Sequence, residues 1–257
     1  QRFRKIWTAG FVLVVVGAIA DFSALAFGAQ SVVAPLGSLT LVANIFLAPI
    51  MHKEELTKRD VLCTGVILAG CGISVAFASH KEEVCDVKSL LGLYSKASFA
   101  AYAGTIVIVV CSGLIAIRYM ERVQLLYGSR SREYQRVFKY HRLSYAALSG
   151  ITGAQSVLFA KSVDELLVSS FSGGRFFLAY PGTYPIIFAL LLCIGLQIYW
   201  LNKGLARWDA LYEVPVFQAF WIICTVVGGG VFYGEFSSFS TTQALVFPGG
   251  IVLTVAG

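Results

Sequence analysis

One carboxylate, Asp21, lies well inside an apolar stretch of this sequence. An ionisable side chain at bilayer depth costs at least about 2.5–3.5 kcal/mol to insert, so it is expected to face a polar cavity and to have a function. Carboxylate oxygens are the ligands that hard cations prefer, and an ion that keeps several waters needs only one or two of them. The alternative is a structural pair between Asp21 and a buried Lys or hydroxyl group.

Several other polar side chains fall at depths where they could contact a solute. Lys161 ends an apolar run, and it either snorkels to the interface or reaches inward toward Asp21 or an anion. Buried amides in a helical bundle bond across helices more often than they bind a solute. Asn44 and Gln218 are favoured because they lie near the depth where a site at the middle of the membrane would form. The candidate substrate-binding residues are Asp21, Asn44, Gln155, Lys161, Asn202, Tyr212 and Gln218.

The composition of the chain excludes an ordinary soluble fold. Of the 257 residues, 57% are hydrophobic and 13% are charged, against about 45–50% and about 25% in soluble domains. The mean hydropathy is +0.75. The apolar runs are continuous rather than alternating, which excludes a transmembrane β-barrel. The sequence therefore predicts an all-α, polytopic membrane protein.

Eight apolar segments approach the length of about 20 residues that a helical crossing needs. They cover Ile6–Gly28, Ser31–Met51, Val61–Ser79, Ala97–Ile117, Leu143–Ala160, Tyr184–Leu201, Leu211–Tyr233 and Thr241–Gly257. No enzyme motif accompanies them, and His52, His80 and His141 are all expected in loops. We therefore expect neither catalysis nor a bound cofactor.

The distribution of basic residues predicts the orientation. If every segment crosses, all but five of the 20 Lys and Arg residues lie on the side of Gln1, so the positive-inside rule places Gln1 in the cytoplasm. The exceptions are Lys81, Lys88, Lys96, Lys161 and Arg175. Topology thus explains the net charge of +6 without a nucleic-acid partner. The basic stretch Arg118–Arg142 is expected to be a cytoplasmic loop, either solvated or touching anionic lipid.

A weak internal repeat appears at an offset of 180 residues. It pairs Leu25 with Leu205, Ala26 with Ala206, Pro35 with Pro215 and Glu55 with Glu235, and each Pro is expected in the first turn of its helix. Corresponding segments are five crossings apart, which predicts two inverted halves, as in many secondary transporters. Chance similarity between apolar stretches is the alternative.

The repeat divides the chain into a first half at 1–117, the basic loop at 118–142 and a second half at 143–257. Segment Leu143–Ala160 would open the second half. Its counterpart would precede Gln1, so the first helix of the first half is expected to be missing from this chain.

Three blocks of the sequence resemble the NIPA magnesium transporters, which belong to the drug/metabolite transporter superfamily. They are ADFSALAFGAQSVVAPLGSL at Ala20–Leu39, GAQSVLFAKS at Gly153–Ser162 and LNKGLARWDALYEVPVFQAFW at Leu201–Trp221. The resemblance covers most of the chain in matching order. It implies nine or ten helices in two inverted halves and transport of Mg²⁺ or similar divalent cations. Members of the family often have Asn where this chain has Asp21.

The resulting hypothesis is a multi-pass transporter that moves Mg²⁺ into the cytosol by alternating access, with Asp21 as an Mg²⁺ ligand. The plasma membrane or an endomembrane is the expected location, and the expected partners are the lipid bilayer, a divalent cation and a second copy in a homodimer. A transporter of a small organic metabolite is the first alternative, favoured if Lys161 and Lys203 both line the cavity. The second is a non-transporting membrane scaffold, a closed bundle in which Asp21 and the amides are all paired.

Overall fold

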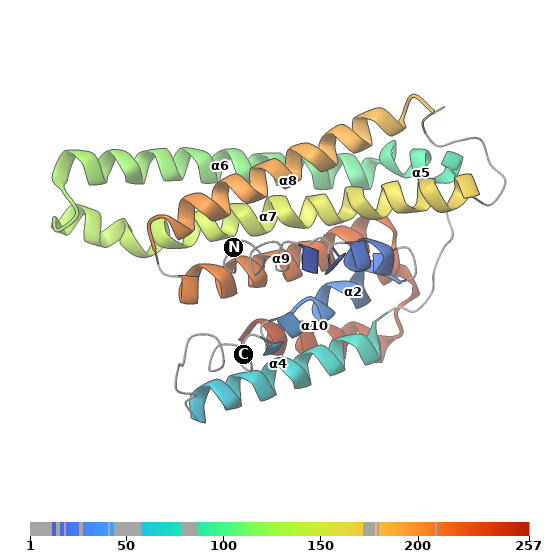
Figure 1. Cartoon of the computed structure of the whole chain (residues 1–257), viewed down its shortest axis with the longest axis horizontal. Coiled ribbons are helices and arrows are strands. Elements are labelled where there is room, and N and C mark those ends of the chain that lie inside the picture. The colour runs from blue at the N-terminus through green and yellow to red at the C-terminus, as the bar shows by residue number, and fades with distance from the viewer. Residues whose placement is uncertain are drawn as a thin grey trace, which may run out of the picture.

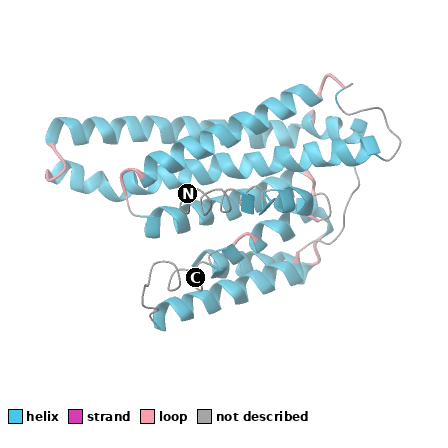
Figure 2. Ribbon diagram, in the orientation of Figure 1, coloured by secondary structure: helices cyan, strands magenta, loops and turns pink. Residues whose placement is uncertain are grey.

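The computed structural model describes residues 12–13, 16–17, 19–25, 28–40, 42–43, 58–78, 87–171, 178, 180–208 and 210–256. These residues form α-helices and one 3₁₀ helix, with no strand among them, as predicted (Figure 2). The elements are α2 Gln30–Leu36, α4 Lys58–Phe77, α5 Val87–Tyr94, α6 Ala97–Tyr127, α7 Arg132–Phe171, α8 Thr183–Leu205, α9 Ala210–Phe232, η2 Glu235–Ser238 and α10 Thr241–Ala256. Residues 19–25 are also helical.

The stretch 118–142, expected as a loop, is almost entirely helical. Helix α6 continues to Tyr127, α7 begins at Arg132, and the chain reverses between them at Gly128, whose φ of 82° suits glycine. The helices persist here because Ile117, Met120 and Val123 recur at helical spacing and are buried. At 1.5 Å per residue, the 31 and 40 residues of α6 and α7 extend well beyond a hydrocarbon core of about 30 Å.

The predicted crossing Ser31–Met51 is interrupted near its start. Helix α2 ends at Leu36, and residues 37–38 form a turn before helical residues resume. Pro35 has no N–H to donate, and its carbonyl accepts hydrogen bonds from both the hydroxyl of Ser38 at 2.6 Å and the backbone N–H of Ser38 at 3.0 Å, which closes the turn. Pro35 and Pro215 are each the sixth residue of their helix, so the expectation of a first-turn position was wrong for both.

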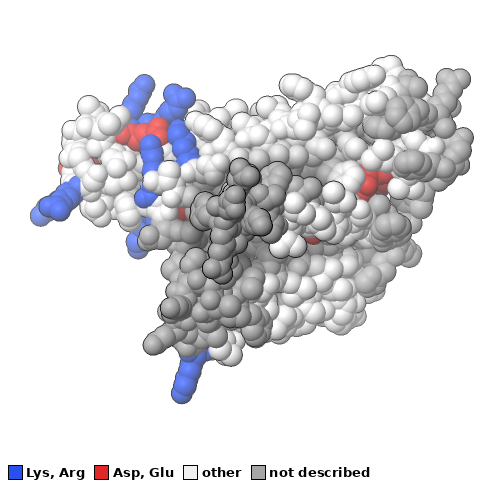
Figure 3. Space-filling view, viewed as in Figure 1, with Lys and Arg blue, Asp and Glu red and all other residues white. Residues whose placement is uncertain are grey.

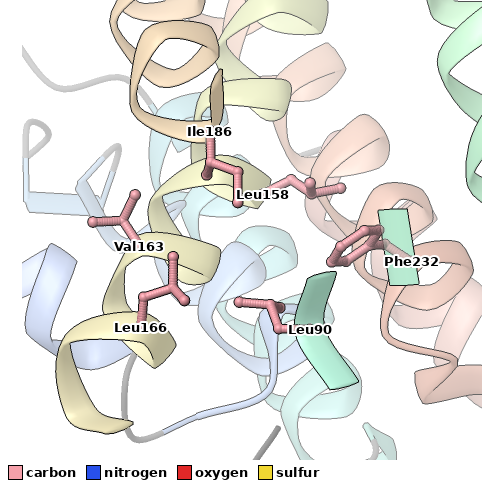
Figure 4. Packing of buried hydrophobic residues seen from close by; sticks show 6 residues of the cluster. All are labelled: Leu90, Leu158, Val163, Leu166, Ile186 and Phe232. Atoms are coloured by element: carbon pink, nitrogen blue, oxygen red, sulfur yellow. The ribbon is translucent and has the colours of Figure 1, made fainter. Parts of the chain in front are cut away.

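Helix α7 is the centre of the bundle. It packs along α8 on one side and α9 on the other and pairs with α6 in the hairpin, while α2 covers α9 (Figure 1). Figure 4 shows the apolar core where α5, α7, α8 and α9 meet. Its buried residues are Leu90, Leu158, Val163, Leu166, Ile186 and Phe232.

The outer faces of the long helices are apolar. Ile108 and Ile115 on α6 are 69% and 71% exposed, and Phe188 on α8 is 68% exposed. Among the described residues, three helices are long and apolar enough to cross a membrane: Ala97–Tyr127, Thr183–Leu205 and Tyr212–Phe232. A surface of this kind is stable against lipid rather than water.

Charged side chains gather at one end of the molecule. Figure 3 shows Lys and Arg clustered where α6 turns into α7; exposed residues there include Arg118, Arg122, Arg130, Arg132 and Arg136. We call this the basic end, and the end where α2 begins and α9 finishes the opposite end.

Helices α4 and α10 pair closely through small residues. They run antiparallel (Figure 1). A Cβ built on Gly70 of α4 would overlap the backbone of Thr254 and lie 2.8 Å from the Gly250 carbonyl oxygen. A Cβ on Gly250 of α10 would lie 2.6 Å from the Ser74 hydroxyl. The two backbones can approach this closely only because both positions lack a side chain.

Candidate functional site

A buried ion pair lies at the opposite end of the bundle. The Glu235 carboxylate accepts hydrogen bonds from the backbone N–H groups of Gln30 at 2.9 Å and Ser31 at 3.0 Å. The Lys161 ammonium lies 4.0 Å from Glu235 Oε1 and donates to the Gly28 carbonyl at 3.1 Å. Residues 161 and 235 are 9% and 7% exposed. We call these five residues the Lys161–Glu235 cluster.

This cluster connects α2, α7 and the end of α9. Glu235 follows α9 and occupies the N-terminus of α2, where unpaired N–H groups and the helix dipole favour an anion. Lys161 comes from α7, and its ammonium lies 4.7 Å from the centre of the Tyr233 ring. Because its charge is shared between a carboxylate, a carbonyl and an aromatic face, Lys161 reaches inward rather than snorkelling.

A second polar group lies midway along α7. The Gln155 amide nitrogen donates to the Tyr102 hydroxyl of α6 at 2.9 Å. Ser156 is the next residue along α7, and its hydroxyl lies 3.5 Å from Gln197 Oε1 of α8. These groups bond across helices, as buried amides in a bundle commonly do.

A third polar network lies at the basic end. Glu121 Oε1 of α6 accepts from the Tyr145 hydroxyl at 2.6 Å and lies 3.1 Å from an Arg207 nitrogen and 4.0 Å from the Lys203 ammonium. Arg207 also donates to the Tyr145 hydroxyl at 2.7 Å. The network therefore connects α6, α7 and α8.

The structure spreads the predicted site residues along the bundle. Asp21 is exposed and has no hydrogen bond or ion pair with another described residue. Asn202 is also exposed, and Gln218 is half-buried. Tyr212 lies at the basic end with the Arg142 guanidinium 3.7 Å from its ring centre. Asn44 lies outside the described residues.

Lys161 and Gln155 belong to different polar groups on α7. Lys161 lies in the cluster at the opposite end, whereas Gln155 bonds to Tyr102 midway along the helix. In the part of the chain that is described, no three His, Cys, Asp or Glu side chains gather into a group that could hold a metal ion. An ion that keeps most of its waters needs no such cage.

Four acidic residues were not among the predicted site residues. Glu235 and Glu121 hold the polar networks at the two ends, and Glu213 and Asp164 are buried with unpaired carboxylate oxygens. The sequence paired Glu235 with Glu55 at the repeat offset, which was a usable signal. Nothing in the sequence indicated burial for Glu121 or Asp164, because both lie just outside the predicted crossings.

His141 was expected in a loop, and that prediction was wrong. It lies on α7, is fully buried, and its Nδ1 is 3.1 Å from the Tyr134 hydroxyl. Burial, together with the nearby charge of Arg207, lowers the pKa of His141 to about 4, although Glu121 partly opposes the shift. The folded protein therefore holds His141 in the neutral form.

This pKa predicts a loss of stability in acid. Below the unfolded pKa of about 6.5, the unfolded chain takes up a proton that the folded chain does not, so folding stability falls as the pH drops toward 4. Between about pH 7 and about pH 5 the loss is about 2 kcal/mol. This loss of stability is measured by thermal unfolding of the wild-type protein and of His141→Phe in detergent, each at both pH values. An equal pH response in the two proteins would contradict the buried neutral imidazole.

Comparison with known proteins assigns the family. A sequence model described as "Magnesium transporter NIPA" matches residues 3–257. The chain is 30% identical over 253 residues to the probable magnesium transporter NIPA8 of Arabidopsis thaliana, covering 98% of this chain and 57% of that protein. It is 28% identical to the probable magnesium transporter NIPA1 of Arabidopsis thaliana, covering 98% of this chain and 70% of that protein.

A human protein also matches. The magnesium transporter NIPA4 of Homo sapiens is 24% identical over 252 residues, which cover 98% of this chain and 58% of that protein. The chain thus spans between 57% and 70% of the length of these relatives. No solved structure gives a significant match. The match of one family model over nearly the whole chain is decisive, and the chain belongs to the NIPA magnesium transporter family.

Proposed function

We propose that the protein containing this chain carries Mg²⁺ or similar divalent cations across a bilayer by alternating access between two inverted halves. The observation that carries the proposal is the family match over residues 3–257, together with relatives named as magnesium transporters. In this scheme residues 1–117 belong to the first half, 118–142 extend α6 and α7 at the basic end, and 143–257 form the second half.

The contacts between α4 and α10 support the inverted arrangement. At the repeat offset of 180 residues, Gly70 corresponds to Gly250 and Ser74 to Thr254. Gly70 lies against Thr254, and Gly250 lies against Ser74. Exchanging the corresponding residues of the two halves therefore converts the first contact into the second. A reciprocal contact between antiparallel helices is what a two-fold axis between inverted repeats produces.

The cation is expected to pass between these halves. We assign its path to Asp21, Asn44, Gln155, Lys161, Asn202, Tyr212 and Gln218, with Asp21 as the Mg²⁺ ligand. Lys161 would repel a cation only if its charge were free, and its contacts with Glu235 and the Gly28 carbonyl support a role in closing the opposite end.

The positions of two lysines favour a cation over an organic anion. Lys161 pairs with Glu235 at the opposite end, and Lys203 pairs with Glu121 beside Tyr145 at the basic end. At about 1.5 Å per residue, residues 145 and 161 of α7 are about 24 Å apart along the helix axis. Two ammonium groups so far apart, each with its own carboxylate, do not form one anion site.

The basic end is expected to face the cytosol. Exposed Arg and Lys side chains gather there (Figure 3), and cytoplasmic loops carry an excess of these residues. With this orientation, Mg²⁺ would enter from the side of the Lys161–Glu235 cluster and leave at the basic end, across the plasma membrane or an endomembrane.

A flux measurement tests the proposal. The full-length protein is reconstituted into liposomes that contain a Mg²⁺ dye, and uptake is compared for wild type, Asp21→Ala and the exposed control Glu133→Gln. We expect saturable uptake in wild type and the control, and its loss in Asp21→Ala. Folded wild-type protein that gives no uptake above empty liposomes would overturn the Mg²⁺ assignment and favour an organic solute.

A further inference from the structure

The outer face of α6 changes from apolar to basic at the basic end of the bundle. Ile108 and Ile115 are 69% and 71% exposed. Arg118 and Arg122 follow them along the helix and are also exposed. At 3.6 residues per turn, all four side chains fall within about 80° of one another around the helix axis, whereas the buried Ile117 lies opposite Ile108. The two arginines therefore continue the face of α6 that contacts lipid.

These two arginines lie at the depth of the lipid headgroups. The apolar segment of α6 ends at Ile117, and Arg118 and Arg122 come one and five residues later. At about 1.5 Å per residue they lie about 1.5 Å and about 7.5 Å beyond the hydrocarbon core. The headgroup region extends about 5–8 Å on each side of that core. Both side chains can therefore reach the phosphate groups of lipids that pack against α6.

Two exposed tyrosines mark the same depth. Tyr119 of α6 is 61% exposed, and Tyr140 of α7 is 67% exposed. Tyr119 comes two residues after the apolar segment of α6, and Tyr140 comes three residues before the apolar segment that begins at Leu143. Tyrosine is enriched where membrane meets water, because its ring is apolar and its hydroxyl is polar. The boundary between hydrocarbon and water therefore crosses both helices at the level of Arg118 and Arg122.

The bundle does not use these guanidinium groups itself. Neither Arg118 nor Arg122 forms a hydrogen bond or an ion pair with another described residue. Glu121 is the acidic residue of α6, and it is engaged by Tyr145 of α7 and Arg207 of α8. Lys and Arg side chains project from the surface at this end (Figure 3). Both arginines are therefore available to an anion outside the protein.

We propose that Arg118 and Arg122 form a binding site for anionic phospholipids on the outer face of α6. A guanidinium group is always charged and can donate two parallel hydrogen bonds to one phosphate group. Two such groups one helical turn apart attract a lipid of net negative charge more strongly than a zwitterionic lipid. The acyl chains of the bound lipid lie along Ile115 and Ile108. The proposal requires that α6 spans a membrane, and it does not depend on which solute is transported.

Lipid titration tests this site. The full-length protein in detergent micelles is titrated with phosphatidylserine or with phosphatidylcholine, and native mass spectrometry gives the dissociation constant of the first bound lipid. We expect wild type to bind phosphatidylserine at least about fivefold more tightly, because one basic residue near an anionic surface contributes a factor of about five. In the double variant Arg118→Gln/Arg122→Gln this preference should be lost.

The double variant Arg130→Gln/Arg132→Gln is the matched control. It removes the same charge from exposed positions at the turn between α6 and α7, beyond the end of α6 at Tyr127. That end lies about 15 Å past Ile117 and outside the headgroup region, so the control should keep the preference for phosphatidylserine.

Three results would overturn the proposal. Equal affinity of wild type for the two lipids would show that no anionic-lipid site exists. An equal loss of preference in both double variants would show that the net charge of the basic end attracts the lipid, without a site on α6. Loss of the wild-type preference in millimolar inorganic phosphate would assign the two arginines to free phosphate instead of a lipid headgroup.

Discussion

Replacement of Glu235 by Gln is expected to lower the free energy of unfolding by about 3–5 kcal/mol. The carboxylate accepts two backbone hydrogen bonds at the start of α2 and lies beside the Lys161 ammonium, and both side chains are nearly buried. A neutral amide offers one acceptor oxygen instead of two and leaves the ammonium without its counter-charge. Denaturant unfolding in detergent micelles, followed by circular dichroism, measures the loss.

Two further variants separate the ion pair from the helix cap. Lys161→Met removes the ammonium but leaves both backbone hydrogen bonds to Glu235, and the double variant Lys161→Met/Glu235→Gln gives the coupling energy of the pair. The exposed Glu133→Gln is the matched control and should change stability by less than about 0.5 kcal/mol. A loss of under about 1 kcal/mol in Glu235→Gln would show that the pair behaves as a surface salt bridge and would contradict the prediction.

The sequence predicted most of the helices because apolar runs directly reflect the lipid they face. The segments Tyr184–Leu201, Leu211–Tyr233 and Thr241–Gly257 match α8, α9 and α10 to within a few residues. Its largest error occurred where the sequence pattern changed outside the membrane. Hydropathy cannot distinguish a charged loop from an amphipathic helical extension, so 118–142 was expected as a loop although Ile117, Met120 and Val123 bury one helical face.

The candidate site was harder to predict because partners are set by tertiary contacts. Sequence reasoning ranked residues by type and depth, which singled out Lys161 and Gln155 but could not provide Glu235 or Tyr102 as their partners. Glu235 looked like an ordinary loop residue beyond a helix end. Its role depends on α2, more than 200 residues earlier in the chain, beginning beside it. Glu213 was seen only as the start of a helix, and its burial follows from Gly204 and α7.

Gly70→Ala is expected to destabilise the protein by about 3 kcal/mol. The new methyl group would overlap the Thr254 backbone and press on the Gly250 carbonyl, and backbone atoms cannot rotate away as a side chain can. The α4 and α10 backbones would have to separate, which removes contacts along their whole crossing. Thermal unfolding in detergent micelles measures the stability. A cysteine pair introduced elsewhere along the two helices reports their separation through its crosslinking rate.

Glycines on the same two helices provide matched controls, because a Cβ on Gly72 or on Gly249 would meet nothing within 4 Å. Gly72→Ala and Gly249→Ala should therefore raise stability by about 0.5–1 kcal/mol through helix propensity alone. Gly250→Ala should match Gly70→Ala, since its Cβ meets Ser74 as that of Gly70 meets Thr254. Equal effects at 70 and 250, with gains at 72 and 249, are what two inverted halves in contact require. A large loss at only one of the two positions would contradict a reciprocal crossing.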